Sequence, residues 1–200
     1  MYLQNLSIPD GMQAELIGVR GADSMAAGYQ EAMESSDAKY KIYLHQDIFV
    51  INPGALQTVI AIFRKNPTIG IIGLVGAAVL STDRPVWWES PARCGKVYNR
   101  KSMEEIQMDI YGEFSGDFML AQALDGIFLA TQYDVPWRKD LFQDWHFYDI
   151  SQTQEFIRHG CQAAIIQQDT PWVVHIAGRK NMDKKYWVSM EIFQQHYLTE

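Results

Sequence analysis

Apolar residues are grouped along the first half of the chain so that predicted strands and helices alternate. The groups predict strands at residues 14–19, 39–44 and 69–75 and helices at residues 21–36 and 53–65. The second helix is the clearest, because Leu56, Val59 and Phe63 follow at spacings of three and four residues and form one apolar stripe. Such alternation is typical of an α/β domain with a mixed, mostly parallel sheet flanked by helices.

The second half of the chain is less regular. The predicted elements are strands at 95–98, 163–166 and 172–175, an aromatic loop at 86–91, and helices at 151–158 and 182–197. The first of these helices should begin at Ser151, because Ser151 and Gln154 form a capping box. Residues 119–131 are apolar except for Gln122 and Asp125, whereas residues 100–117 show no clear period.

Composition and charge narrow the class of protein. The 200 residues are 48% hydrophobic and include six Trp, ten Tyr and nine Phe. This composition favours a single folded domain that spans residues 1–200. The net charge of −7 disfavours nucleic acid as a partner. The longest apolar run, residues 69–80, is too short to cross a bilayer, and the first residues do not form a signal peptide. We therefore expect a cytoplasmic protein with two reduced cysteines and no transmembrane segment.

A polar cluster directly follows the strand predicted at 39–44. His45, Gln46 and Asp47 stand at its carboxyl end, before the chain returns to apolar residues. In open α/β sheets, ligands bind at this end of the strands. His45 and Asp47 are two positions apart and therefore point to the same side of an extended chain. An imidazole and a carboxylate placed together favour a site for a divalent metal ion.

Several motifs occur in one order: SMAAGYQEAM, YLHQDIFV, GLVGA, VWWES, LDGIFLAT and WHFYDISQTQEF. With them the chain resembles, over roughly residues 8–172, the family 2 glycosyltransferases, in the branch of streptomycin-biosynthesis-type glycosyltransferase-like domains. The resemblance implies a GT-A fold. About residues 1–80 would bind a nucleotide-sugar donor, and about residues 81–200 would bind a saccharide or another hydroxyl acceptor. It also implies Mn²⁺ or Mg²⁺, held on the donor diphosphate by a D-x-D motif.

The resemblance assigns roles to individual residues. His45 and Asp47 stand at the two carboxylate positions of the D-x-D motif, and the imidazole suits Mn²⁺ better than Mg²⁺. His175 corresponds to a late histidine that completes the metal shell. Asp149 corresponds to the general base of an inverting transferase, and the helix that follows it should keep its carboxyl ionised. The residues expected to contact donor or acceptor are Asp23, Gln30, Gln46, Trp87, Trp88, Asp125, Gly126 and Trp145.

Two features depart from the family. Its first strand, which normally forms part of the pocket for the nucleotide base, is absent before residue 14, and the edge left open favours a homodimer. Gln30 replaces the asparagine that is usual in the A-Y-N-E-A-M stretch. Beyond the late histidine, Arg179, Lys180, Lys184 and Lys185 are expected to form a solvated face; the alternative is that Arg179 or Lys180 closes on the diphosphate.

Each assignment has an alternative. Asp144 is a rival base, and His175 is equally a satisfied core or loop histidine. Asp125 is equally a carboxylate held by backbone donors in a turn, and Trp87 and Trp88 are equally core or interface residues. Two other classes of function stay open: a metallohydrolase or iron enzyme with a two-His-one-carboxylate site, and a non-catalytic binding or assembly module.

Overall fold

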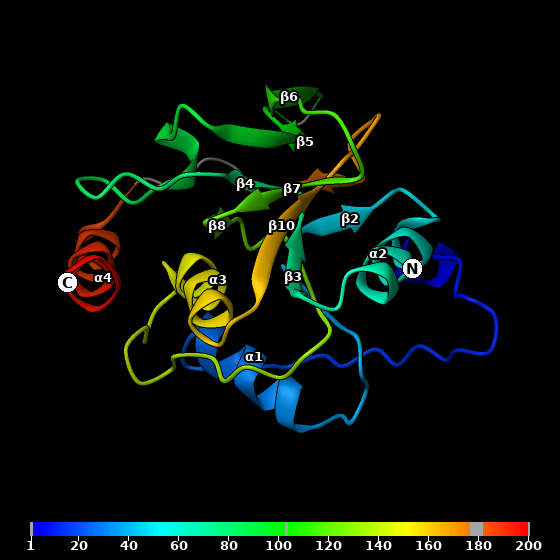
Figure 1. Ribbon diagram of the computed structural model, residues 1–200, viewed down its shortest axis with the longest axis horizontal. Coiled ribbons are helices and arrows are strands. Elements are labelled where there is room, and N and C mark those ends of the chain that lie inside the picture. The colour runs from blue at the N-terminus through cyan, green and yellow to red at the C-terminus, as the bar shows by residue number, and fades with distance from the viewer. Residues whose placement is uncertain (1, 103, 177–181, 200) are drawn as a thin grey trace.

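The computed structural model describes residues 2–102, 104–176 and 182–199, in which two sheets pack with helices around them (Figure 1). The helices are α1 (Met25–Glu34), α2 (Ala55–Lys65), α3 (Tyr148–Arg158) and α4 (Lys184–Phe193). Short helical turns are η1 (Tyr2–Asn5), η2 (Trp87–Glu89) and η3 (Gln194–Leu198). The strands are β1 (Lys41–Leu44), β2 (Ile48–Val50), β3 (Ile69–Gly73), β4 (Val75–Ala77), β5 (Arg93–Arg100), β6 (Ile106–Gly112), β7 (Phe118–Ala121), β8 (Ala123–Leu124), β9 (Phe128–Thr131), β10 (Gln162–Ile166) and β11 (Val173–His175). None of the helices within the described ranges has the length and apolar character needed to span a membrane.

The sheets are mixed, and most of their pairs are antiparallel. One sheet has the order β1-β9-β3-β10-β7, and the other has the order β2-β11-β5-β4-β8 with β6 beside β5. Among the described pairs, β3–β10 and β5–β11 are parallel. The α/β class is confirmed, but the prediction of a mostly parallel sheet is wrong. The reason is that β9 lies antiparallel between β1 and β3 and separates the strands of the first half.

Two local predictions need correction, and a segment without a predicted element contains a strand. Residues 14–19 form no strand, and Leu16 is 77% exposed, because no neighbouring strand pairs with this segment. Helix α3 begins at Tyr148 rather than at Ser151, whose hydroxyl is buried and donates to the Tyr148 carbonyl at 3.0 Å instead of capping the helix. Residues 100–117 contain β6, which completes a hairpin with β5.

Helices α1 and α2 follow the predicted pattern. Ser24 caps α1 by accepting a hydrogen bond from Ala27 N at 3.1 Å, as expected of a serine at this position. Helix α2 buries Val59 and Phe63 and ends at Lys65, with Asn66 as its C-cap directly before a proline. In these two helices, the local signals and the packing agree.

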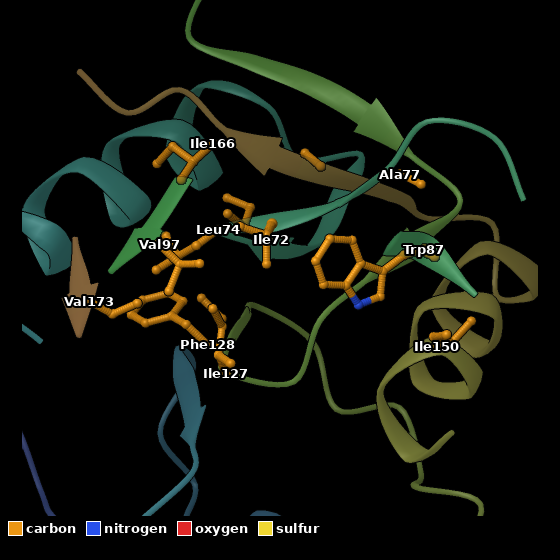
Figure 2. Packing of buried hydrophobic residues seen from close by; sticks show 14 of the residues in the cluster. Ile72, Leu74, Ala77, Trp87, Val97, Ile127, Phe128, Ile150, Ile166 and Val173 are labelled. Atoms are coloured by element: carbon orange, nitrogen blue, oxygen red, sulfur yellow. The ribbon is translucent and has the colours of Figure 1, made fainter. Parts of the chain in front are cut away.

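The main core joins the two sheets. Figure 2 shows Ile72, Val97 and Phe128, which come from β3, β5 and β9, close together, with Trp87 beside them. Each of the first three is at most 3% exposed. Burying such a side chain contributes about 1.5–3 kcal/mol, so this cluster fixes how the sheets meet. Ile150 of α3 belongs to the same cluster, which ties the start of that helix to both sheets.

Candidate active site

His45 and Asp47 lie in the turn between β1 and β2, next to His175 at the end of β11. Residues 45–47 carry the chain from the five-stranded sheet to the other one. β2 then pairs antiparallel with β11, and the register places His175 opposite Ile48. Ile176 N donates to the Asp47 carbonyl at 3.0 Å and extends this pairing into the turn. The strand register therefore brings His175 to the polar turn.

The three side chains form a cluster, which we call the His–Asp triad (His45, Asp47 and His175). Each offers one ligand atom, and these atoms all lie within 4.8 Å of one another. Nδ1 of His45 is 3.9 Å from Asp47 Oδ1, and Nε2 of His175 is 3.7 Å from Asp47 Oδ2. All three residues are half-buried. The residues predicted as metal ligands thus lie together at one point of the surface.

The triad fits a divalent metal ion. Within the described residues, Asp47 Oδ1 is buried and has no hydrogen-bond partner, which is costly for a carboxylate oxygen unless a cation or water completes it. The outward nitrogens of both imidazoles are engaged: Nε2 of His45 contacts the Tyr148 hydroxyl, and Nδ1 of His175 lies 3.2 Å from Asn99 Oδ1. Metal-binding histidines are commonly held in this way by an outer partner.

Asp149 lies in the first turn of α3. Its Oδ2 accepts a hydrogen bond from Gly126 N and its Oδ1 accepts one from Ile150 N, both at 2.9 Å. The residue keeps some exposure, but the surrounding protein withdraws water from the carboxyl. This desolvation is the main cause that raises the pKa of Asp149 to about 7, and the negative charge of Asp125 raises it further. The backbone hydrogen bonds at the helix end lower the pKa of this carboxyl and favour its ionised form, but desolvation outweighs them.

The backbone before Asp149 is unusual. Apart from glycines, Phe147 is the residue with positive φ in the described chain, at 58°. Its ring packs against Tyr186 and Phe193, with centroids 5.4 and 5.5 Å away. A bulky residue in this conformation costs about 1–3 kcal/mol and persists only where packing enforces it. The Phe147 conformation starts α3 abruptly and fixes the direction in which Tyr148 and Asp149 leave the backbone.

Asp125 and Gly126 form the turn that faces α3. Asp125 Oδ1 accepts from Ile127 N and its Oδ2 accepts from the indole Nε1 of Trp87, each at 2.9 Å. Both oxygens of Asp125 thus have protein donors, and Trp87 is buried. These contacts are those of a carboxylate held in a turn and of a tryptophan in the core. A Cβ at Gly126 would overlap the Tyr148 hydroxyl, which explains the glycine.

The other residues predicted to contact donor or acceptor range from buried to exposed. Gln30 is buried and holds the loop after β9, because its Oε1 accepts from Trp137 N at 2.8 Å. Trp88 is half-buried and packs against Tyr186 at 6.2 Å. Three residues are exposed at the surface: Asp23, Gln46 and Trp145. Arg179 and Lys180 lie outside the described residues.

Asp144, the rival base, forms an ion pair with Lys185, whose Nζ lies 2.6 Å from Asp144 Oδ1. The exposed fraction of the Lys185 side chain is 65%, so this is a surface pair. Asp144 belongs to the segment before α3, and within the described residues its hydrogen bonds go to Met25 N and Lys185.

Tyr148 and Asn99 are the neighbours that sequence reasoning missed. Tyr148 is adjacent to Asp149 and Asn99 lies in β5, but no local pattern marks either as a partner of a histidine. Asn99 meets His175 because β5 pairs with β11, whereas Tyr148 reaches His45 from the first turn of α3. A groove of about 660 Å³ between α2 and the segment joining β10 to β11 contains neither residue and none of the triad.

The chain belongs to a family of glycosyltransferases. A family model described as "Glycosyltransferase like family" matches residues 1–197. This covers nearly the whole chain and confirms the family 2-like domain, without extending to the streptomycin-type branch or to an absent first strand. No curated protein matches the sequence.

Proposed function

We propose that the protein is an inverting glycosyltransferase that moves a sugar from a nucleotide-sugar donor to a hydroxyl group of a saccharide or another acceptor. The observation that carries the proposal is the His–Asp triad, held by Tyr148 next to Asp149, in a chain of this family. His45 and Asp47 come from residues 1–80, which we assign to donor binding, and His175 comes from residues 81–200, which we assign to acceptor binding.

His45, Asp47 and His175 would hold the metal ion, and two imidazoles favour Mn²⁺ over Mg²⁺. When bound, the ion would supply positive charge that stabilises the leaving diphosphate. The half-buried position of the triad limits its contact with water and so strengthens such charge interactions. Gln46 is exposed on the same turn and would face the donor.

Asp149 would take the proton from the acceptor hydroxyl. With a pKa raised to about 7, its carboxyl is ionised in a substantial fraction at neutral pH and accepts a proton more readily than an ordinary aspartate. Gly126 N and Ile150 N hold its two oxygens, which fixes the direction of the carboxyl. Attack from the face opposite to the diphosphate would invert the configuration of the sugar.

We also propose membership of the streptomycin-type branch, a cytoplasmic location and a homodimer. The two cysteines, Cys94 and Cys161, are free, as a reducing compartment would leave them.

The first test is a thermal-shift panel with UDP-, GDP-, CMP- and dTDP-sugars, each with and without Mn²⁺. A ligand that binds the folded protein raises its melting temperature according to occupancy. We expect one nucleotide to give a shift that requires Mn²⁺. A protein that binds no nucleotide sugar under any condition, while well folded, would refute the transferase proposal and favour a non-catalytic module.

A further inference from the structure

Strand β6 is an edge of the sheet that contains β2 and β11. Within the described residues β5 is the strand that pairs with it, and Figure 1 shows β6 at the margin of the molecule. Three apolar residues alternate along β6 on one face, and we call them the β6 stripe (Ile106, Met108 and Ile110). Their exposed fractions are 54%, 45% and 50%. Folded proteins usually protect such an edge with charges, a proline or a covering segment.

The opposite face of β6 is occupied within the fold. Tyr111 packs edge-on against Trp87, with ring centroids 5.0 Å apart. Asp109 Oδ2 accepts a hydrogen bond from Asn99 Nδ2 at 2.8 Å. These contacts hold β6 in one orientation on β5, because successive residues of a strand point to opposite faces. The β6 stripe therefore stays on the outside of the described fold.

The backbone of the stripe residues is directed to the free edge. Lys101 N donates to the Glu105 carbonyl at 2.9 Å, and the hairpin register places these two residues opposite each other. Along an antiparallel pair, opposite residues that exchange hydrogen bonds alternate with those that do not. Glu105 therefore faces β5, and the stripe residues turn their N–H and C=O groups away from it. Outside the ladder with β5, none of the backbone hydrogen bonds among the described residues uses these groups.

The β6 stripe is complementary to a second copy of itself. When two antiparallel β6 strands are centred on Met108, Ile106 of each copy lies opposite Ile110 of the other copy. The two Met108 side chains then meet at the two-fold axis. On the opposite face, Asp109 lies opposite Gln107, whose amide can donate to the carboxylate. Apolar residues thus meet apolar residues, and no two like charges lie directly opposite each other in the strand.

The neighbouring two-fold registers are less favourable. Centring the pair on Asp109 places two carboxylates directly opposite each other, and centring it on Gln107 places Asp109 opposite Glu105. Like charges in directly opposite positions destabilise a strand pair. A shift by a single residue would bring the stripe of one copy to the polar face of the other. The charges of β6 therefore select Met108 as the centre.

We propose that β6 is a dimer interface, at which two copies of the chain pair antiparallel about Met108 and join their sheets. Both copies use the same edge, so the pairing closes on itself and association stops at two chains. The proposal is independent of the transfer reaction, because β6 contains neither Asp149 nor a member of the His–Asp triad.

Sedimentation equilibrium over a dilution series tests the association. We expect the wild type to approach twice the chain mass of 23.0 kDa as its concentration rises. Met108→Lys places two like charges at the two-fold axis and should sediment as a monomer throughout. Met182→Lys is the matched control, since it makes the same change at a methionine that is 42% exposed before α4, and it should dimerise as the wild type does.

Far-UV circular dichroism of each variant confirms that the chain has folded. A wild type that is monomeric at every concentration overturns the proposal. So does a folded Met108→Lys that dimerises like the wild type, or a wild type that assembles beyond two chains.

The register is tested with single cysteines and a thiol cross-linker short enough to join only directly opposed residues. The background is Cys161→Ser, which leaves Cys94, a buried residue. Met108→Cys should cross-link to its own copy. Ile106→Cys should not, because its two copies lie four residues apart along the strands, roughly 14 Å. A mixture of Ile106→Cys and Ile110→Cys chains should cross-link.

The outcomes separate this proposal from the proposed function. A Met108→Cys chain that does not cross-link overturns the pairing about Met108, even if the wild type dimerises. Loss of donor binding in the thermal-shift panel would refute the transferase, and sedimentation and cross-linking would still decide the role of β6.

Discussion

Asp47 in the triad and Asp149 in the first turn of α3 differ in how their oxygens are satisfied. Asp47 Oδ1 is buried and has no partner among the described residues, whereas both oxygens of Asp149 accept hydrogen bonds from backbone N–H groups. A buried oxygen without a donor is incomplete until a cation or water reaches it. A desolvated carboxyl with a raised pKa is instead prepared to take up a proton. Two aspartates of one site are thus suited to different tasks by their surroundings.

The largest effect should come from removing the base. Asp149→Asn preserves size and leaves an oxygen to accept a backbone hydrogen bond, but it cannot take the acceptor proton. We expect transfer to fall by about 10²- to 10⁴-fold, while the Mn²⁺-dependent thermal shift with the donor persists. Asp144→Asn is the control, since its carboxylate is in a surface pair with Lys185. If Asp144→Asn lost transfer to this extent and Asp149→Asn kept full activity, Asp144 rather than Asp149 would be the base.

The opposite side of the comparison is tested at Asp47. Asp47→Asn removes the negative charge and should weaken Mn²⁺ by at least about tenfold, because hard divalent cations prefer carboxylate oxygens. Isothermal titration with Mn²⁺ measures this. Asp10→Asn, the same change at an exposed position, should leave the affinity unchanged. If Asp47→Asn binds Mn²⁺ as the wild type does, the cation site is elsewhere.

Gly126 lies against the Tyr148 hydroxyl, and its N–H donates to Asp149, so Gly126→Ala should disturb both residues. The added Cβ would overlap the Tyr148 hydroxyl, and such overpacking costs about 1–3 kcal/mol in the free energy of unfolding. Gly18→Ala is the control, because nothing lies within 4 Å of a Cβ there. Urea unfolding of both variants measures the difference. Equal stabilities would mean that the turn at Gly126 is looser than the packing indicates.

The smallest effect is a dependence on pH. Because the pKa of Asp149 is raised to about 7, the folded protein binds this proton more tightly than the unfolded chain does. The carboxyl therefore destabilises the fold above about pH 7, and this penalty is relieved as the pH falls toward the usual aspartate range, about 4.

Unfolding free energies of the wild type and Asp149→Asn, compared from about pH 8 to about pH 5, should show the wild type gaining relative to the variant as the pH falls. In the same range kcat/KM should decrease, because the protonated carboxyl is no longer a base. Parallel stability curves for the two proteins would mean that Asp149 titrates normally.

The sequence was sufficient where a local pattern controls the structure. Ser24 and the stripe of α2 define their helices, and the polar cluster after the strand predicted at 39–44 marks the segment that carries His45 and Asp47. It was insufficient where distant segments meet. No local signal places β9 between β1 and β3, and none pairs Asn99 with His175, because these contacts depend on the register of strands from both halves. The start of α3 was misjudged since tertiary packing holds Phe147 at positive φ, which overrides the signal at Ser151.

The pairing of β2 with β11 has a consequence for the synthesis of the protein. A chain leaves the ribosome from its N-terminus, and β2 emerges long before the strand that completes its sheet. Until β11 arrives, His45 and Asp47 lack the third member of the cluster. Contacts between residues so far apart also form late in folding, because a long loop must close first. A nascent or truncated chain that ends before β11 therefore lacks His175 and cannot form the complete His–Asp triad.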